Sequence, residues 1–403
     1  MATQRVSRPT TTHPLHSPDF YAGDPYPAYR ELRATTPVVW NDVTNFWALC
    51  KYEDIRFVSG NPGLFTSTKG ITIPDPALPE PVQEGNLIFT DPPRHRQLRN
   101  LINAGFTRRQ VTLLEPKIRN LVKGIVDGID STREYEFAEE IAAPLPTRMI
   151  AEMLGAPPED WEQFRTWSDA AVGTADPDIE MDSLQALAEL YNYFTKLIAD
   201  RRSGEADGED LLSILAAAEV DGERLSDEDL LNFSFLLLVA GNETTRNLLA
   251  LGTKALIDHP DQFALLRRDP SLLPDAVEEM LRYTSPVTHM ARRATEDIEI
   301  RGQQIAAGEI VVMLYGSANR DEEIFGTGSE TFDITRRPNT HIAFGAGEHA
   351  CLGAQLARLE ARVMFEVLLG AYPTIELTGD VTRLRATMVP GVKRMPVRMS
   401  AGV

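Results

Sequence analysis

The chain has few cysteines, and it has no apolar run long enough to cross a membrane. Only two of its 403 residues are cysteines, Cys50 and Cys351, and they lie about 300 positions apart. Such a pair, in a chain with no sign of an export signal, does not indicate a structural disulfide. The most apolar stretch, residues 233–240, is far shorter than the roughly 20 residues of a membrane-spanning helix. We therefore expect a cytoplasmic protein without membrane insertion.

Positive charge is also scarce, with 40 Lys and Arg against 59 Asp and Glu and a net charge of −19. A nucleic-acid partner would have to bind against this repulsion, so none is expected. The apolar share of 43% is ordinary for a globular protein. Arg5 and Arg8 stand among Ser, Thr and Pro, and we expect residues 1–18 to form a flexible tail. Residues 19–403 are expected to form one catalytic domain, active as a monomer.

The periodicity of apolar residues predicts a mainly α protein with small β-sheets, an α+β class. Most of residues 93–256 has helical spacing, and a last helix is expected over 354–369. Alternating apolar residues predict paired strands over 38–49 and a β-meander over 298–314. Residues 70–85 contain four prolines, which indicates a long loop of the kind that contacts substrate.

One of the two cysteines stands in an unusual context, within the segment FGAGEHACLG from Phe344 to Gly353. Gly345 and Gly347 permit a tight turn there, and Gly353 allows the next helix to lie close to a flat partner. A helix N-terminus favours a thiolate, which predicts a lowered pKa for Cys351. A lone cysteine is usually a small buried apolar residue. This context predicts a thiolate ligand instead.

The longest expected helix spans about residues 226–259, with Ser226 as its N-cap. Its apolar middle is interrupted by the polar segment AGNET at 240–244. In one interpretation Glu243 pairs with Arg246 on a wet face, and Thr244 bonds back to a carbonyl one turn earlier. In the other, Glu243 and Thr244 belong to a reactive site, because a buried acid costs free energy unless it is paired or hydrated.

A third signal is the pair Glu279 and Arg282, three residues apart on a helix that opens at Pro274 and must stop before Pro286. Spacing alone favours a surface salt bridge worth tenths of a kcal/mol.

The order of these segments along the chain resembles the motifs of the cytochrome P-450 family, in its soluble bacterial class. The resemblance extends from about Asp19 to the C-terminus and implies that fold, with haem b between the long central helix and the cysteine-loop helix. It makes Cys351 the iron ligand and Glu243 and Thr244 the catalytic proton relay. It assigns cofactor contacts to His95, Arg99, Ala240, Gly241, Arg292, Phe344, His349, Cys351 and Gly353, and a structural network to Glu279, Arg282 and Arg336.

The same resemblance implies particular roles for these positions. Phe344 packs on the sulfur side of the haem, and Ala240 and Gly241 leave room for dioxygen. The propionates are bound by His95, Arg99, Arg292 and His349, with Arg293 as an alternative to its neighbour. Substrate would be contacted by the loop over residues 70–88, by residues 171–193, and by Ile88, Val239, Val287, Thr288, Met388 and Val389.

The activity that the resemblance implies is haem-thiolate monooxygenation, which inserts one atom of dioxygen into a C–H bond of a hydrophobic small molecule. A steroid, terpene, branched lipid or natural product is expected. The chain has no flavin or iron–sulfur motif, so electrons from NAD(P)H would arrive through a ferredoxin and its reductase. A docking patch for them is expected at Arg99, Arg108, Arg109, Arg336, Arg337 and Arg358. Two alternatives stay open, a peroxide-driven hydroxylase of the same fold and a haem-binding sensor without turnover.

Overall fold

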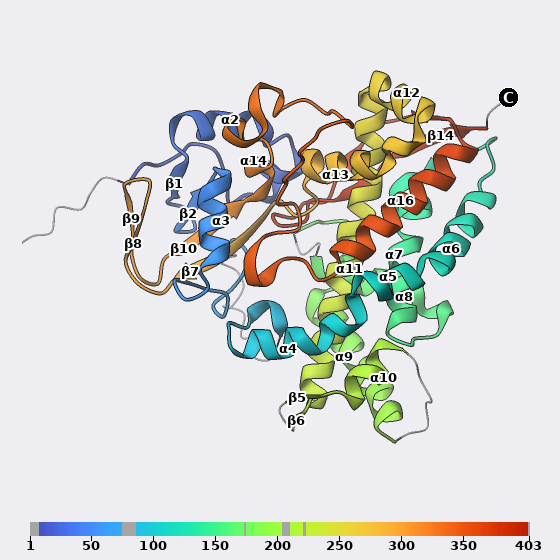
Figure 1. Ribbon diagram of the computed structural model, residues 1–403, viewed down its shortest axis with the longest axis horizontal. Helices are drawn as coiled ribbons and strands as arrows, with labels where there is room; N and C mark the ends of the chain where they lie inside the picture. Colours follow the sequence, from blue (N-terminus) through green and yellow to red (C-terminus); the bar gives the residue numbers. More distant parts are fainter. Residues whose placement is uncertain (1–7, 75–85, 173–174, 204–209, 221–222, 402–403) are drawn as a thin grey trace, which may run out of the picture.

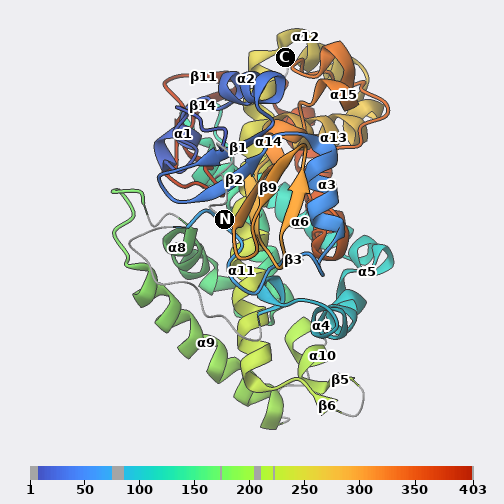
Figure 2. The same cartoon turned by 90° about the vertical axis from the view of Figure 1, so that its left-hand side faces the viewer.

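The computed structural model describes residues 8–74, 86–172, 175–203, 210–220 and 223–401. A sheet-rich lobe and a larger helical body lie side by side, and the long helix α11 (Asp227–Asp258) runs through the helical body in both views (Figures 1 and 2). None of the helices in these ranges has the length and apolar character needed to cross a membrane.

The other α-helices are α1 (Pro18–Ala22), α2 (Tyr26–Thr35), α3 (Tyr52–Gly60), α4 (Arg94–Asn103), α5 (Arg108–Leu113), α6 (Glu115–Asp127), α7 (Pro144–Met153), α8 (Trp161–Val172), α9 (Ser183–Ser203), α10 (Leu211–Ala217), α12 (Pro260–Arg268), α13 (Leu273–Thr284), α14 (Tyr315–Ala318), α15 (Glu322–Phe325) and α16 (Ala354–Ala371). The strands are β1 (Val38–Asn41), β2 (Phe46–Leu49), β3 (Phe65–Thr66), β4 (Tyr135–Glu136), β5 (Glu219–Val220), β6 (Glu223–Arg224), β7 (His289–Ala294), β8 (Ile298–Ile300), β9 (Gln303–Ile305), β10 (Ile310–Leu314), β11 (Thr374–Leu377), β12 (Thr382–Arg383), β13 (Val392–Arg394) and β14 (Pro396–Ser400).

The main sheet has the strand order β1-β2-β10-β7-β3. Both of its faces are buried. Successive side chains of a strand point to opposite sides of the sheet, so one strand contributes to the core on each face. Val311 and Met313 of β10 enter one core cluster, and Val312 and Leu314 enter another. The predicted pairing over residues 38–49 is confirmed. The predicted meander is wrong in detail, since β7 pairs directly with β10 while β8 and β9 form a separate hairpin.

Helix α11 begins as its sequence predicts. The Ser226 hydroxyl accepts a hydrogen bond from the Asp229 N–H, and the Asp229 carboxylate accepts one from the Ser226 N–H, which completes a capping box. The helix packs against α7, α8, α9, α13 and α16. Because neighbours surround it, its middle can be apolar on every side, and any polar residue there faces the interior.

The N-terminal tail is shorter than expected. Residues 1–7 lie outside the described part of the chain, but residues 8–17 pack on the main sheet. Leu15 is fully buried, its carbonyl accepts a hydrogen bond from the Tyr21 hydroxyl at 2.8 Å, and Thr10 forms a β-bridge to Trp40. The prediction of a flexible tail up to residue 18 was wrong for this stretch, because one apolar side chain in polar sequence supplies the anchor.

Candidate active site between the cysteine loop and helix α11

The loop before α16 is a compact turn closed by its own backbone. The Cys351 N–H donates to the Phe344 carbonyl at 2.8 Å, and the Ala350 N–H donates to the Gly347 carbonyl at 3.1 Å. Gly345 and Gly347 both have φ of +70°, a conformation that costs other residues free energy. At Gly347 a Cβ would also stand 2.1 Å from the Ser59 carbonyl oxygen of α3. The backbone conformation and the close approach to α3 therefore each require glycine at residue 347, as the sequence predicts.

The thiol at the end of this loop belongs to a residue that water reaches. Cys351 is accessible to water although protein atoms surround its sulfur. Burial raises the pKa of the thiol, and the backbone N–H groups of Gly353 and Ala354, with the guanidinium groups of Arg99 and Arg358, counteract it only in part. The prediction of a lowered pKa was wrong for the free thiol, because desolvation outweighs the helix terminus.

A second water-accessible position interrupts the buried middle of α11. Ala240 is exposed, and Val239, Gly241 and Thr244 are partly exposed, in a helix whose flanking turns are mostly buried. A Cβ at Gly241 would lie 2.8 Å from the terminal methyl group of Ile150 on α7, so this side chain would have to turn away. Exposure inside a packed helix marks open space beside it, and Ala240 is the residue that borders it most.

Glu243 and Thr244, which follow on α11, make both contacts that the first interpretation of this segment predicts. Arg246 donates to the Glu243 carboxylate at 2.5 Å, and the Thr244 hydroxyl donates to the Ala240 carbonyl at 2.7 Å. This face of the helix is buried from water, however, since the Glu243 side chain is 1% exposed and the Arg246 side chain 4%. Burial raises the pKa of Glu243 to about 8, with Arg246 opposing the shift. An acid that holds its proton at neutral pH suits proton delivery.

His95, Arg99, Arg292 and His349 lie close enough near the cysteine loop for their charges to act on one another. The His95 and His349 rings lie 4.2 Å apart, and both ring nitrogens of His95 are buried without a hydrogen bond in the described structure. Arg292 is buried and donates to the Ala291 carbonyl, and no carboxylate of the described residues pairs with it. Arg293, the alternative, donates to the Gly308 carbonyl instead. Unsatisfied buried donors of this kind fit an anionic ligand such as the propionates of haem.

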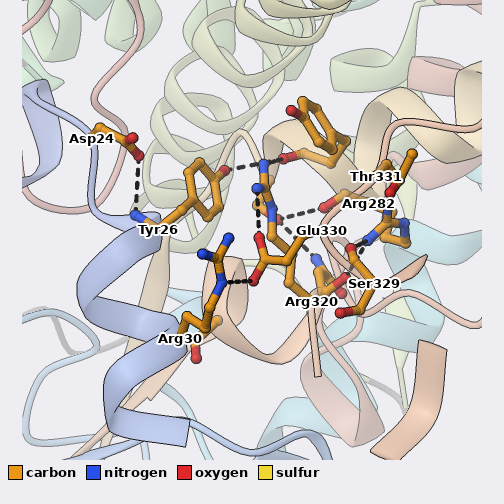
Figure 3. A network of polar contacts seen from close by, with 12 residues as sticks. Asp24, Tyr26, Arg30, Arg282, Arg320, Ser329, Glu330 and Thr331 are labelled. Carbon is orange, nitrogen blue, oxygen red and sulfur yellow. Dashed lines mark hydrogen bonds and ion pairs between the residues drawn. The ribbon is translucent and has the colours of Figure 1, made fainter. Parts of the chain in front are cut away.

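Glu279 and Arg282 form a buried network instead of the surface salt bridge that their spacing alone favours. Both side chains are 0% exposed, and the guanidinium of Arg282 donates to both Glu279 oxygens at 2.7 Å. It also donates to the carbonyls of Ser329 and Thr331, in the segment before the cysteine loop (Figure 3). Arg336 adds a contact to Glu279 at 3.1 Å. A buried pair with every donor satisfied fixes the position of this segment.

Comparisons with known proteins agree with this architecture. A family model described as Cytochrome P450 matches residues 176–387. A steroid C26-monooxygenase of Mycobacterium tuberculosis is 43% identical over 391 residues, 94% of this chain and 95% of that protein. The chain belongs to the cytochrome P450 family.

Other relatives of this P450 share its length and fold. A methyl-branched lipid omega-hydroxylase of Mycobacterium tuberculosis is 40% identical, over 96% of this chain and 94% of the relative. The structure of a Mycobacterium marinum cytochrome P450 in complex with pseudoionone superposes with a TM-score of 0.88 at 38% identity, covering 97% of this chain and 99% of the other. The P450 is accordingly a monooxygenase of hydrophobic substrates that uses haem, dioxygen and redox partners. This outcome excludes the sensor without turnover.

The positions that the sequence assigns to substrate divide into two groups. Ile88, Val239, Val287 and Met388 are partly exposed. Thr288 and Val389 are buried, and the Thr288 hydroxyl donates to the Thr387 carbonyl at 2.6 Å, which ties β7 to the segment before β13. Residues 75–85 and 173–174 of the two expected substrate segments lie outside the described residues.

Sequence reasoning missed one function of Arg99. Its guanidinium donates to the carbonyls of Glu348 at 2.9 Å and Ala350 at 2.5 Å, so it holds the cysteine loop from the side of α4. On α16, the Arg358 guanidinium lies 4.5 Å from the centre of the Phe344 ring and pairs with Glu278. Nothing in the local sequence signals these contacts, because each joins residues of distant elements.

Proposed function

We propose that this P450 hydroxylates an aliphatic C–H bond of a steroid or a methyl-branched lipid, with Cys351 as the thiolate ligand of haem b. The observation that carries the proposal is the pair of water-accessible positions, Cys351 on the loop and Ala240 on α11, inside an otherwise packed protein. The substrate class rests on two relatives, named a steroid C26-monooxygenase and a methyl-branched lipid omega-hydroxylase.

Residues of this chain would prepare the site in three ways. Haem, when bound, supplies the activation of dioxygen and the oxidation of the C–H bond. Arg99 and Arg292 would neutralise its propionates, and His95 and His349 would donate hydrogen bonds to them. The small side chain of Ala240 would leave room beside α11. Glu243 would hold a proton and pass it toward the hydroxyl of Thr244.

Electrons would come from NAD(P)H through a ferredoxin and its reductase, with the protein acting as a cytoplasmic monomer. Most of the expected arginine patch has other partners: Arg99 binds the cysteine loop, while Arg336, Arg337 and Arg358 pair with Glu279, Asp275 and Glu278. Docking through this patch then depends chiefly on Arg108 and Arg109, both exposed on α5. Charge reversal at these two positions should slow reduction by ferredoxin without changing substrate binding.

The two cysteines supply a matched test of the iron ligand. Cys351→Ala should abolish the thiolate-type spectrum of the reduced carbon monoxide complex, whereas Cys50→Ala should retain it, because Cys50 is fully buried in the core of the sheet-rich lobe. A thiolate-type spectrum in Cys351→Ala would overturn the assignment.

The substrate class is tested by titrating the holoenzyme with steroids, methyl-branched fatty alcohols and acyclic terpenes while following the spin state of the iron. Compounds that shift it should be oxidised with NADPH and a surrogate ferredoxin system. Equal turnover driven by hydrogen peroxide alone would favour the peroxide-driven alternative. Failure of every steroid and branched lipid to shift the spectrum would refute the proposed substrate class.

A further inference from the structure

A second carboxylate lies beside Glu243, on the neighbouring helix α8. The Arg246 guanidinium bridges the two, with one nitrogen 2.5 Å from a Glu243 oxygen and another 2.9 Å from an Asp169 oxygen. The exposed fraction rises outward along this group, from 1% at Glu243 and 4% at Arg246 to 21% at Asp169. Among these three side chains Asp169 is therefore the one that water reaches most easily, while Glu243 is sealed inside.

The charges around Glu243 do not balance. Glu243, Asp169 and Glu139 each contribute a negative charge, whereas Arg246 and Arg165 each contribute a positive one. Arg165 pairs with Glu139, and another Glu139 oxygen lies 3.7 Å from Arg246. Glu139 and Arg165 are 36% and 28% exposed, so water screens this outer pair. If every group is ionised, the inner members Glu243, Asp169 and Arg246 therefore carry one excess negative charge, and one proton would remove it.

The contacts of the Glu243 carboxylate indicate that this group would hold the proton. The Oε1 atom of Glu243 is buried and receives no hydrogen bond in the described structure. The Asp169 side chain contacts Glu243, and its charge and hydrogen bond both raise the pKa of Glu243, adding to the larger effect of burial. A proton on Glu243 would remove the repulsion between the two carboxylates, as in other pairs of acids that share a site.

We propose that Asp169 is a positioning residue that shares the proton of Glu243 and replaces it from solvent. When Glu243 gives its proton toward the Thr244 hydroxyl, Asp169 takes one from water and passes it to the vacated Glu243 oxygen. Each cycle moves one proton inward and returns the cluster to its starting charge. The inference rests on the proposed role of Glu243 and adds the entry point of its proton, between α8 and α11.

A structural alternative exists, because Asp169 also ties α8 to α11 through Arg246. Glu139→Gln is a matched control for it, since this substitution makes the same charge change in the same cluster without touching Glu243. In the holoenzyme, Asp169→Asn should lower kcat by about tenfold or more. This is less than the roughly 10²–10⁴-fold effect of removing a direct general acid, because Asp169 acts through Glu243. The substitution should also raise the solvent deuterium isotope effect and leave KM nearly unchanged. Glu139→Gln should stay within about twofold of the wild type, and Asp169→Glu should recover most of the rate.

Infrared spectroscopy supplies a readout that needs no turnover. At neutral pH the wild type should show a buried protonated carboxyl band that Glu243→Gln removes, and Asp169→Asn should shift it while Glu139→Gln should not. A band unmoved by Asp169→Asn, or kinetic effects equal to those of Glu139→Gln, would overturn the proposal. If the wild type turns over none of the candidate compounds, the proposed substrate class fails, whereas the infrared bands still decide the shared proton.

Discussion

The strongest structural test of the cysteine loop is Gly347→Ala compared with Gly302→Ala. Both glycines have positive φ, +70° at Gly347 and +77° at Gly302, where alanine costs about 1–2 kcal/mol of backbone free energy. The surroundings differ, because an added Cβ meets nothing within 4 Å at Gly302 but stands 2.1 Å from the Ser59 oxygen at Gly347. The comparison therefore isolates the contact between the loop and α3.

The expected effect at Gly347 is larger and has a functional consequence. The clashing atom belongs to the backbone of α3 and cannot rotate away, so the loop must move, and overpacking of this kind typically costs about 1–3 kcal/mol more. We expect Gly302→Ala to lower the free energy of unfolding by about 1–2 kcal/mol and Gly347→Ala by about 2–5 kcal/mol. Because Cys351 closes the same loop, only the second variant should lose haem.

Denaturant unfolding gives the two free energies, and the spectrum of the reduced carbon monoxide complex gives the fraction of protein with thiolate-bound haem. Equal destabilisation of the two variants, or full haem content in Gly347→Ala, would refute the reasoning that the approach to Ser59 fixes the position of the loop.

Three further outcomes follow from the buried charges. Glu279→Gln leaves the buried guanidinium of Arg282 without its counter-charge, and denaturant unfolding should show a loss of about 3–5 kcal/mol. Arg292→Met should speed the transfer of haem to apomyoglobin, whereas Arg293→Met should leave it unchanged. Burial raises the pKa of Glu360 from 4.5 to about 8, so the native state holds a proton that the unfolded chain has lost between these values. The free energy of unfolding should therefore fall as pH rises through that window, and Glu360→Gln should flatten the fall.

Local rules predict the parts of the site that lie within one segment. Ser226 and Asp229 mark the start of α11 because a capping box needs only four consecutive residues. Gly345 and Gly347 indicate a tight turn because positive φ is a property of single residues. The burial of Glu279 and Arg282 was different, since their spacing alone favoured a surface pair. Only the resemblance to a family reversed that interpretation, because burial depends on the segment around Ser329 that covers the pair.

Contacts between distant elements could not be predicted in this way. The packing of Ile150 against Gly241, the hold of Arg99 on the Ala350 carbonyl and the approach of Asp169 to Glu243 each join residues far apart in the chain. No periodicity or spacing encodes such a pair, and the side chains alone are compatible with many partners. They become specific only when packing sets the distance between two helices.

The two interpretations of the segment at 240–244 are compatible once burial is known. A salt bridge of Glu243 with Arg246 was first an argument against function, because on a wet face it would need no further explanation. In a dry interior the same pair costs free energy, and one guanidinium serving Glu243 and Asp169 leaves a negative charge that a proton would remove. The contact that suggested an ordinary helix surface thus belongs to a buried cluster. There burial and Asp169 raise the pKa of Glu243 against the opposing charge of Arg246, one residue before Thr244 and on the helix that carries Ala240.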